Sequence, residues 1–237
     1  MGFVDVDSQY KELRSQYPYL FLNKDENVFR ISGTIVINVA ELNDAFEIEI
    51  VIDKEYPLKP PFVRDLDSKI PKDYHRIKGG YFCLETPYTL NQIFKQQPTL
   101  LYFVNELVIP YLFNYHMFQK TGIMPFGQRN HGITGIMDDF KNRLNANDDI
   151  TVIKLIQMLV EDNYRGHYDC PCGSKKRIRN CHADKLLKLK VEGYNFMEDY
   201  LMMVFSVKDK VNIVPLISKK ARQFIKEKGD SPKPDKL

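Results

Sequence analysis

Two runs of alternating apolar and polar residues constrain the fold of this chain more than any other feature of its sequence. They span residues 29–38 (Phe-Arg-Ile-Ser-Gly-Thr-Ile-Val-Ile-Asn) and 45–53 (Ala-Phe-Glu-Ile-Glu-Ile-Val-Ile-Asp), and Asn43-Asp44 lies between them. Successive side chains of a strand point to opposite faces of a sheet, so a period of two that is rich in Ile and Val is typical of half-buried strands. The short polar connection predicts that the two strands form an antiparallel pair.

A proline-rich segment follows the second run. Residues 56–61 read Tyr-Pro-Leu-Lys-Pro-Pro, and proline cannot donate a hydrogen bond to the ladder of a sheet. We therefore expect a rigid, extended bend here, after which residues 62–66 return as a third strand of the meander. Residues 67–81 are polar and contain glycine, which favours a long surface loop.

Helices are expected on both sides of this meander. A short amphipathic stretch begins at residue 7 and ends at Pro18, and helical spacing recurs from residue 99 to 113, where Pro110 should break or kink the helix. Residues 150–164 place apolar side chains on one face, and Asp148-Asp149 directly before them suit the positive end of a helix dipole. Together, the meander and these helices predict an α+β fold.

The composition excludes several classes of protein. With 237 residues, 43% hydrophobic and 27% charged, the chain has the make-up of a globular protein and not of a disordered one or a disulfide scaffold. Its formal net charge is only +3, and its Lys and Arg residues are scattered, which argues against a nucleic-acid binder. No apolar run reaches the ~18 residues of a membrane-spanning helix, and the N-terminus does not read as a secretory signal. We expect a cytoplasmic protein whose four cysteines are nucleophiles or metal ligands.

Cys83 is the first candidate for chemistry. It stands in a Gly-Tyr-Phe-Cys-Leu context, 22 residues after Pro61, and His75 precedes it. The order of strand, Tyr-Pro-x-x-Pro-Pro-x-Val, histidine and Gly-x-Phe-Cys-Leu resembles the ubiquitin-conjugating (UBC) fold over roughly residues 7 to 120, a span that suits one domain. The fold that this resemblance implies is an antiparallel meander sheet flanked by helices.

The resemblance also implies an activity. In that family, the cysteine receives the C-terminus of a ubiquitin-like protein from an activating enzyme as a thioester and passes it to an amine, usually of a lysine, on a target protein. A thiolate suits this task because it is nucleophilic and also leaves readily. The expected partners are the ubiquitin-like modifier, the activating enzyme and the target. The resemblance further implies a bacterial branch of the family, from operons that pair such a protein with a modifier, an activating enzyme and an isopeptidase, often in antiphage defence.

The reactivity of Cys83 depends on its neighbours, because a free thiol has a pKa near ~8.5 and is mostly protonated at neutral pH. His75, Arg76 and Lys78 precede it closely enough in the sequence to supply positive charge. The alternative is that Cys83 is a buried, inert cysteine at the end of a strand.

Three further side chains are candidate catalytic groups alongside Cys83 and His75. Glu85 could hold or deprotonate the incoming amine, or it could be a helix cap or part of a surface salt bridge. His116 and His131 flank a segment rich in glycine and aromatic residues, which the resemblance places after the helix that follows the cysteine. Either histidine could orient a nucleophile or donate to an oxyanion, although a lone histidine in such a segment is more often structural.

The chain departs from the family pattern in three respects. His75-Arg76-Ile77 stands where the family usually has His-Pro-Asn, its spacing to Cys83 is shorter, and the chain contains no tryptophan. The family's asparagine supports the oxyanion of the tetrahedral intermediate, and loss of one such donor typically costs about 10²- to 10³-fold in rate. Oxyanion stabilisation is therefore expected from another group.

A second constellation lies near the C-terminus. Cys170, Cys172, Cys181 and His182 fall within 13 residues, in the order Cys-Pro-Cys-Gly-Ser, then Cys-His. Four such ligands are enough for a closed tetrahedral site, so we expect a structural Zn²⁺. The spacing resembles the SEC-C zinc motif of the SecA translocation ATPase. The alternative is three free cysteines and a chance histidine. The basic residues 175–179 within the motif could touch phosphate or an acidic protein face, or could form a solvated loop.

These features predict three regions. Residues 1–145 would form the UBC-like conjugating domain, residues 146–217 a helix, the zinc knuckle and a following helical segment, and residues 218–237 a basic, partly disordered tail. The expected function is that of a ubiquitin-conjugating-like enzyme that carries its acyl group on Cys83. The alternatives are a non-catalytic scaffold that holds a ubiquitin-like protein, favoured by the missing His-Pro-Asn, and a protein adaptor that acts through its zinc knuckle.

Overall fold

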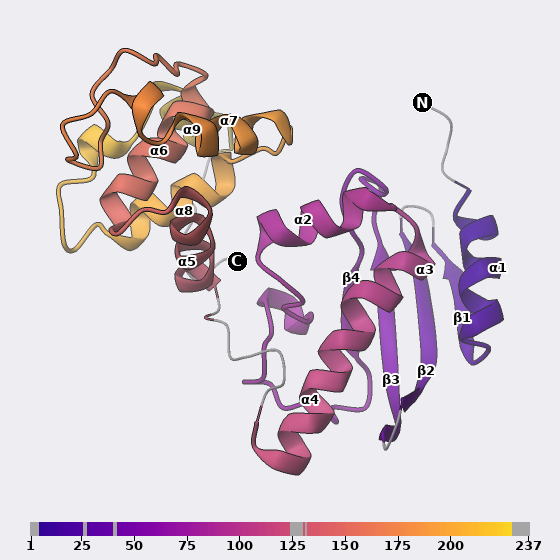
Figure 1. Ribbon diagram of the computed structural model, residues 1–237. Coiled ribbons are helices and arrows are strands. Elements are labelled where there is room, and N and C mark those ends of the chain that lie inside the picture. Colours follow the sequence, from indigo (N-terminus) through magenta and orange to yellow (C-terminus); the bar gives the residue numbers. More distant parts are fainter. Residues whose placement is uncertain (1–4, 26–27, 40–41, 124–129, 131, 229–237) are drawn as a thin grey trace. The chain divides into compact units, whose positions relative to one another are not determined.

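A computed structural model describes residues 5–25, 28–39, 42–123, 130 and 132–228 (Figure 1). The chain divides into two compact units, Met1–Arg129 and Asn130–Leu237, which we call unit 1 and unit 2. Unit 1 is an α+β domain, and the described part of unit 2 is helical. The α+β class predicted from the sequence is therefore confirmed.

Unit 1 contains the predicted meander. Its four strands follow one another in the order β1-β2-β3-β4, and each neighbouring pair is antiparallel. The longest pairing joins β2 to β3, with Phe29 opposite Ile52. The strands are β1 (Leu20–Lys24), β2 (Phe29–Val39), β3 (Leu42–Ile52) and β4 (Phe62–Asp65).

Alternation along β2 and β3 sorts side chains onto the two faces of the sheet. One face is apolar and buried and carries Ile31, Ile35, Ile37, Phe46, Ile48 and Ile50. On the other face, Glu49 forms ion pairs with Arg30 of β2 (3.4 Å) and with Arg64 of β4 (2.6 Å). Opposite charges on neighbouring strands stabilise the register of a sheet, so the polar half of each alternating run also has a structural use.

A long helical segment covers the apolar face of the sheet (Figure 1). It consists of α3 (Leu100–Phe103), a π-helical turn (Val104–Val108) and α4 (Ile109–Thr121). The sequence predicts a break or kink at Pro110, whereas the structure continues as helix through this residue. A proline ring clashes with the carbonyl four residues before it in a regular α-helix, and the wider π turn directly before Pro110 relieves that clash.

The described part of unit 1 also contains two shorter α-helices. The predicted N-terminal helix is confirmed as α1 (Val6–Gln16), which Asp5 caps by accepting a hydrogen bond from the Ser8 N–H at 3.1 Å. The second, α2 (Pro87–Gln96), was not predicted. It begins with Thr86 as the N-cap and proline in the first turn, which is a recognisable start signal. This helix follows Cys83 directly and therefore defines the end of the cysteine loop.

Unit 2 packs around α6, and the predicted helix at residues 150–164 is confirmed there. The boundary between the units falls before α5, not at residue 145 as predicted, because α5 packs against α6 and α8. The segment predicted as a tail begins with a helix, α9. No helix among the residues that the structure describes is long and apolar enough to cross a membrane. The helices are α5 (Gly132–Leu144), α6 (Asp149–Glu161), α7 (Ala183–Val191), α8 (Met197–Ser206) and α9 (Lys219–Lys228), with 3₁₀ turns at Ile178–Asn180 and Val214–Leu216.

Candidate functional sites

The segment that carries Cys83 is a small hairpin tied to the edge of the sheet. Arg76 and Phe82 face each other in an antiparallel bridge. Gly79 and Gly80 form the turn between them, with φ angles of 83° and 78° that favour glycine. The Phe82 N–H donates to the carbonyl of Val63 in β4 at 2.7 Å. The cysteine that follows is thus held beside an edge strand, not in a free surface loop.

A single carbonyl fixes the backbone of Cys83. The Cys83 N–H donates to the carbonyl oxygen of His75 at 2.7 Å. The hydroxyl of Tyr111, from α4, lies 3.2 Å from the same oxygen and 3.2 Å from the carbonyl of Tyr74. The ring of Tyr111 stacks on Phe82 with the ring centroids 4.4 Å apart. The core helix thereby holds the cysteine hairpin, and the Cys83 N–H is already used and does not serve as an oxyanion donor.

Arg76 organises the hairpin and does not act as a free cation. Its guanidinium forms an ion pair with Asp65 at 2.7 Å, and these side chains are only 10% and 5% exposed. It also donates to the carbonyls of Ile70, Pro71 and Gly80. A nearly buried arginine needs such partners, because an unpaired charge would be costly there. Its charge is therefore balanced by Asp65.

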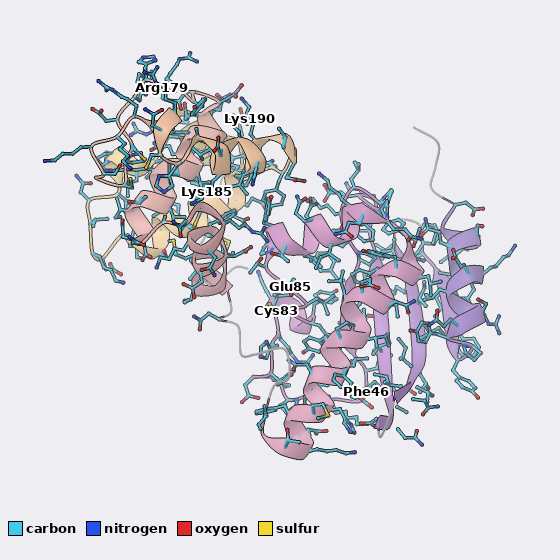
Figure 2. All side chains as sticks on the ribbon, in the orientation of Figure 1. Phe46, Cys83, Glu85, Arg179, Lys185 and Lys190 are labelled. Carbon is cyan, nitrogen blue, oxygen red and sulfur yellow. The ribbon has the colours of Figure 1, made fainter. Side chains whose placement is uncertain are left out.

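The thiol of Cys83 is half-buried and in its protonated form at neutral pH. Burial, and to a smaller extent the negative charge of Glu85, raises its pKa to about 11. Figure 2 shows Cys83 and Glu85 together on the loop that precedes α2. The expectation that His75, Arg76 and Lys78 lower this pKa is therefore wrong, because desolvation of the thiolate and the nearby carboxylate prevail.

The structure does not bring His116 to the cysteine. His116 is buried, and its Nδ1 lies 2.9 Å from a carboxylate oxygen of Asp44 in β3. The cysteine hairpin is attached at Val63, which pairs with Ile50, and Asp44 precedes Ile50 by about 20 Å along an extended strand. His116 therefore anchors α4 to the start of β3, away from Cys83.

The two other candidate histidines have different outcomes. His75 contributes its backbone carbonyl to the cysteine loop, and its ring lies against that of Tyr74 with centroids 4.7 Å apart. His131 lies outside the residues that the structure describes. Asp65 and Tyr111 were missed as site residues, since each lies far from Cys83 in sequence and reads as an ordinary strand or helix residue.

The four predicted metal ligands converge in unit 2. Their donor atoms all lie within 4.8 Å of one another. The Nδ1 of His182 is 3.1 Å from the Sγ of Cys170 and 3.2 Å from the Sγ of Cys181, which in turn is 3.5 Å from the Sγ of Cys172. Donors around a tetrahedral zinc ion, with bonds of about 2.0–2.3 Å, are about 3.5 Å apart. The cluster thus has both the chemistry and the approximate dimensions to hold a metal ion.

Local chain geometry brings these ligands together. The Cys170 N–H donates to the carbonyl of Lys176 at 2.9 Å and closes a turn that contains Cys172. Gly173, with φ at 75°, provides the left-handed step in that turn. Cys181 follows a 3₁₀ turn, and His182 is the residue before the first turn of α7. The helix start and the turn therefore face each other across the cluster.

Burial and neighbouring groups shift the pKa values of Cys172 and His182. The Oγ of Ser174 lies 3.2 Å from the Sγ of Cys172 and 3.4 Å from that of Cys181. Burial alone would raise the pKa of Cys172, but hydrogen bonds that include those from Ser174 lower it to about 7. Burial lowers the pKa of His182 and favours the neutral imidazole, while its ring also bonds the backbone of Asn145. A metal-binding histidine is commonly oriented in this way by a bond from its other ring nitrogen.

No protein-family model matches the chain, and no curated protein matches it. The resemblance to the ubiquitin-conjugating family therefore rests on the residues of the chain itself.

Proposed function

We propose that unit 1 is a ubiquitin-conjugating-like acyltransferase, which accepts a ubiquitin-like protein from an activating enzyme as a thioester on Cys83 and transfers it to an amine on a target protein. The observation that carries the proposal is the setting of Cys83. Its thiol follows a meander sheet on a braced hairpin, and the carboxylate of Glu85 lies beside it. This is an arrangement for a covalent carrier with an adjacent base.

The raised pKa of Cys83 sets the mechanism of loading. With a pKa of about 11, only about one thiol in 10⁴ is ionised at pH 7. The proton must therefore leave as the sulfur attacks the incoming thioester carbonyl, and Glu85 is the nearby group that can accept it. The new C–S bond forms on Cys83, and the thiol of the activating enzyme leaves.

Discharge uses the same carboxylate in a second role. A lysine amine is protonated at neutral pH, so a negative group beside the thioester attracts it and accepts its proton as the nitrogen attacks. The C–S bond then breaks, and the Cys83 thiolate leaves and takes up a proton. Its high proton affinity favours the free thiol as the end state.

A non-catalytic role is the second candidate. The burial of Cys83 and the absence of the family's asparagine favour a scaffold that holds a ubiquitin-like protein without a covalent bond. In that case, the braced hairpin would be a binding surface. The two functions differ in one measurable product, the thioester.

We further propose that Cys170, Cys172, Cys181 and His182 hold one structural Zn²⁺. Three sulfurs and one imidazole are a donor set that zinc prefers, and four protein ligands leave no position open for a substrate. The ion would supply structural cross-linking between the turn and α7. In keeping with the resemblance, the proposal implies a bacterial cytoplasmic protein that works with a modifier and an activating enzyme encoded beside it.

The decisive experiment supplies the modifier, the activating enzyme and ATP, and follows the protein by intact-mass spectrometry. We expect an adduct that thiol reductant removes. Cys83→Ser should give an oxyester that resists reductant, and Cys83→Ala should give no adduct. The three metal-ligand cysteines serve as internal controls. An adduct that persists in Cys83→Ala, or binding of the modifier without any adduct, would favour the scaffold instead.

A further inference from the structure

The small net charge of the chain conceals a local concentration of Lys and Arg residues. Residues 165–190, which we call the knuckle segment, contain eight Lys and Arg residues but only Asp169 and Asp184 as acids. The segment therefore carries +6, whereas the whole chain carries +3. The basic residues are Arg165, Lys175, Lys176, Arg177, Arg179, Lys185, Lys188 and Lys190.

Most of this charge is available to a ligand. All of these side chains except the half-buried Lys185 are exposed. Arg177 pairs with Asp169 (2.8 Å), and Lys190 pairs with Asp162 (2.6 Å), but the two aspartates are 77% and 64% exposed, and exposed pairs contribute little. The other basic residues of the segment have no ion pair with any described residue. Figure 2 shows Arg179 at the rim of unit 2, and Lys185 and Lys190 on α7.

The knuckle segment presents this charge on a fixed frame. The Ile178 N–H donates to the carbonyl of Tyr168 at 2.9 Å, and the Arg179 N–H donates to that of Gly166 at 3.1 Å. A Cβ on residue 166 would lie 3.3 Å from the Cβ of Arg179, so glycine allows this close approach. Because the frame is closed by the metal-ligand cluster, binding would cost less conformational entropy than binding by a free basic tail.

An aromatic platform lies on the same frame. Tyr168 is 49% exposed, and its ring contacts that of exposed His167 edge to face, with centroids 4.8 Å apart. Binding of an acidic protein surface would require only the basic side chains of this segment and would not require the aromatic rings. Exposed aromatic rings between arginines and lysines also suit unpaired bases, which stack on such rings.

We propose that the knuckle segment of unit 2 binds single-stranded nucleic acid. Lys175, Lys176, Arg177 and Arg179 contact the phosphates, and Tyr168 stacks on a base. This site is separate from the acyl-transfer chemistry of Cys83 and goes beyond it. The expectation that Lys and Arg are scattered is wrong for this segment, because residues 165–190 carry more net charge than the whole chain.

The test uses the full-length protein with its metal and a fluorescein-labelled oligouridine of about 20 nucleotides, long enough for one compact site. Fluorescence anisotropy gives the affinity between about 50 and 200 mM salt. The variant K175Q/K176Q/R179Q should bind roughly tenfold or more weakly and should lower the salt slope by about 2, since each phosphate contact to a single strand contributes about 0.7. The control K208Q/K210Q/K226Q loses the same charge at exposed lysines elsewhere in unit 2 and should bind like the parent protein.

Aromatic variants separate nucleic acid from an acidic protein. Tyr168→Ala should weaken binding several-fold, and Tyr168→Phe should not, because stacking needs the ring and not the hydroxyl. Thermal unfolding of each variant confirms that it is folded. Equal losses in the two triple variants would overturn the proposal. Displacement of the oligouridine by polyglutamate of equal charge, together with an unaffected Tyr168→Ala, would assign the segment to an acidic protein surface and overturn it as well.

Discussion

At the residue scale, two effects set the pKa of Cys83. Burial is the larger cause of its raised pKa, and the carboxylate of Glu85 is the second. Arg76, a candidate for a compensating cation, is paired with Asp65 at 2.7 Å. The thiol is therefore mostly protonated at neutral pH, which slows its alkylation and oxidation.

This arrangement predicts the effect of Glu85→Gln. Removal of a negative charge favours the thiolate, so the pKa of Cys83 should fall, but it should stay above that of a free thiol because burial remains. Alkylation of Cys83 by iodoacetamide, followed by mass spectrometry as a function of pH, should show a midpoint shifted to lower pH. Transfer from the thioester to lysine should become slower in the same variant.

The matched control is Glu12→Gln, which removes a carboxylate from an exposed position of α1. It should leave the alkylation profile unchanged. If Glu85→Gln behaves like this control in both measurements, then Glu85 is a surface residue and the proton acceptor lies elsewhere.

At the element scale, α6 is the central helix of unit 2, and Asp148 fixes its start. The Asp148 carboxylate accepts from the Thr151 N–H at 2.8 Å and from the Thr151 hydroxyl at 2.7 Å. Asp148→Ala should lower the free energy of unfolding by about 1 kcal/mol, and Asp148→Asn should cost less because the amide oxygen can still accept. Urea unfolding followed by circular dichroism measures both.

The cost of Asp148→Ala should depend on pH. Burial opposes ionisation of Asp148, but hydrogen bonds from Thr151 outweigh it and lower the pKa. A carboxyl with a lowered folded-state pKa stabilises the fold above its unfolded pKa, and this contribution is lost as the pH falls through the folded value. The difference between the parent protein and Asp148→Ala should therefore shrink in acid, and a difference that grows instead would contradict the assignment.

The elements also show what sequence reasoning could and could not reach. The β2 and β3 strands were predictable because alternation over about ten residues is a local signal. The β1 strand has only five residues, too few for a clear alternation, and it is defined by its pairing with β2. The helix continues through Pro110 because of the π turn before it, and no residue pattern in the sequence predicts that turn. The convergence of Cys170, Cys172, Cys181 and His182 was predictable from spacing alone, since they lie close together in sequence. The brace from Tyr111 was not, because it joins residues 36 and 37 positions apart.

At the scale of the whole molecule, the two units depend on different forces. Unit 1 has a continuous apolar core between its sheet and its helices, and none of its described residues forms a metal-ligand cluster. In unit 2, the segment between α6 and α7 contains one short 3₁₀ turn, and the ligand cluster joins it to the start of α7. The stability of this segment should therefore follow the metal, and that of unit 1 should not.

Removal of the metal tests this division. The purified protein should contain one zinc per chain by elemental analysis, and Cys172→Ser or Cys181→Ser should abolish it. A strong chelator should then raise hydrogen exchange in residues 165–191 while the exchange of β2, β3 and α4 stays unchanged, because a structural zinc contributes its binding energy only to the segment that it closes. Loading of Cys83 should persist in the metal-free protein. Zinc retained by the double variant C172S/C181S would disprove the ligand assignment, and unfolding of the sheet on chelation would show that the two units are not energetically separate.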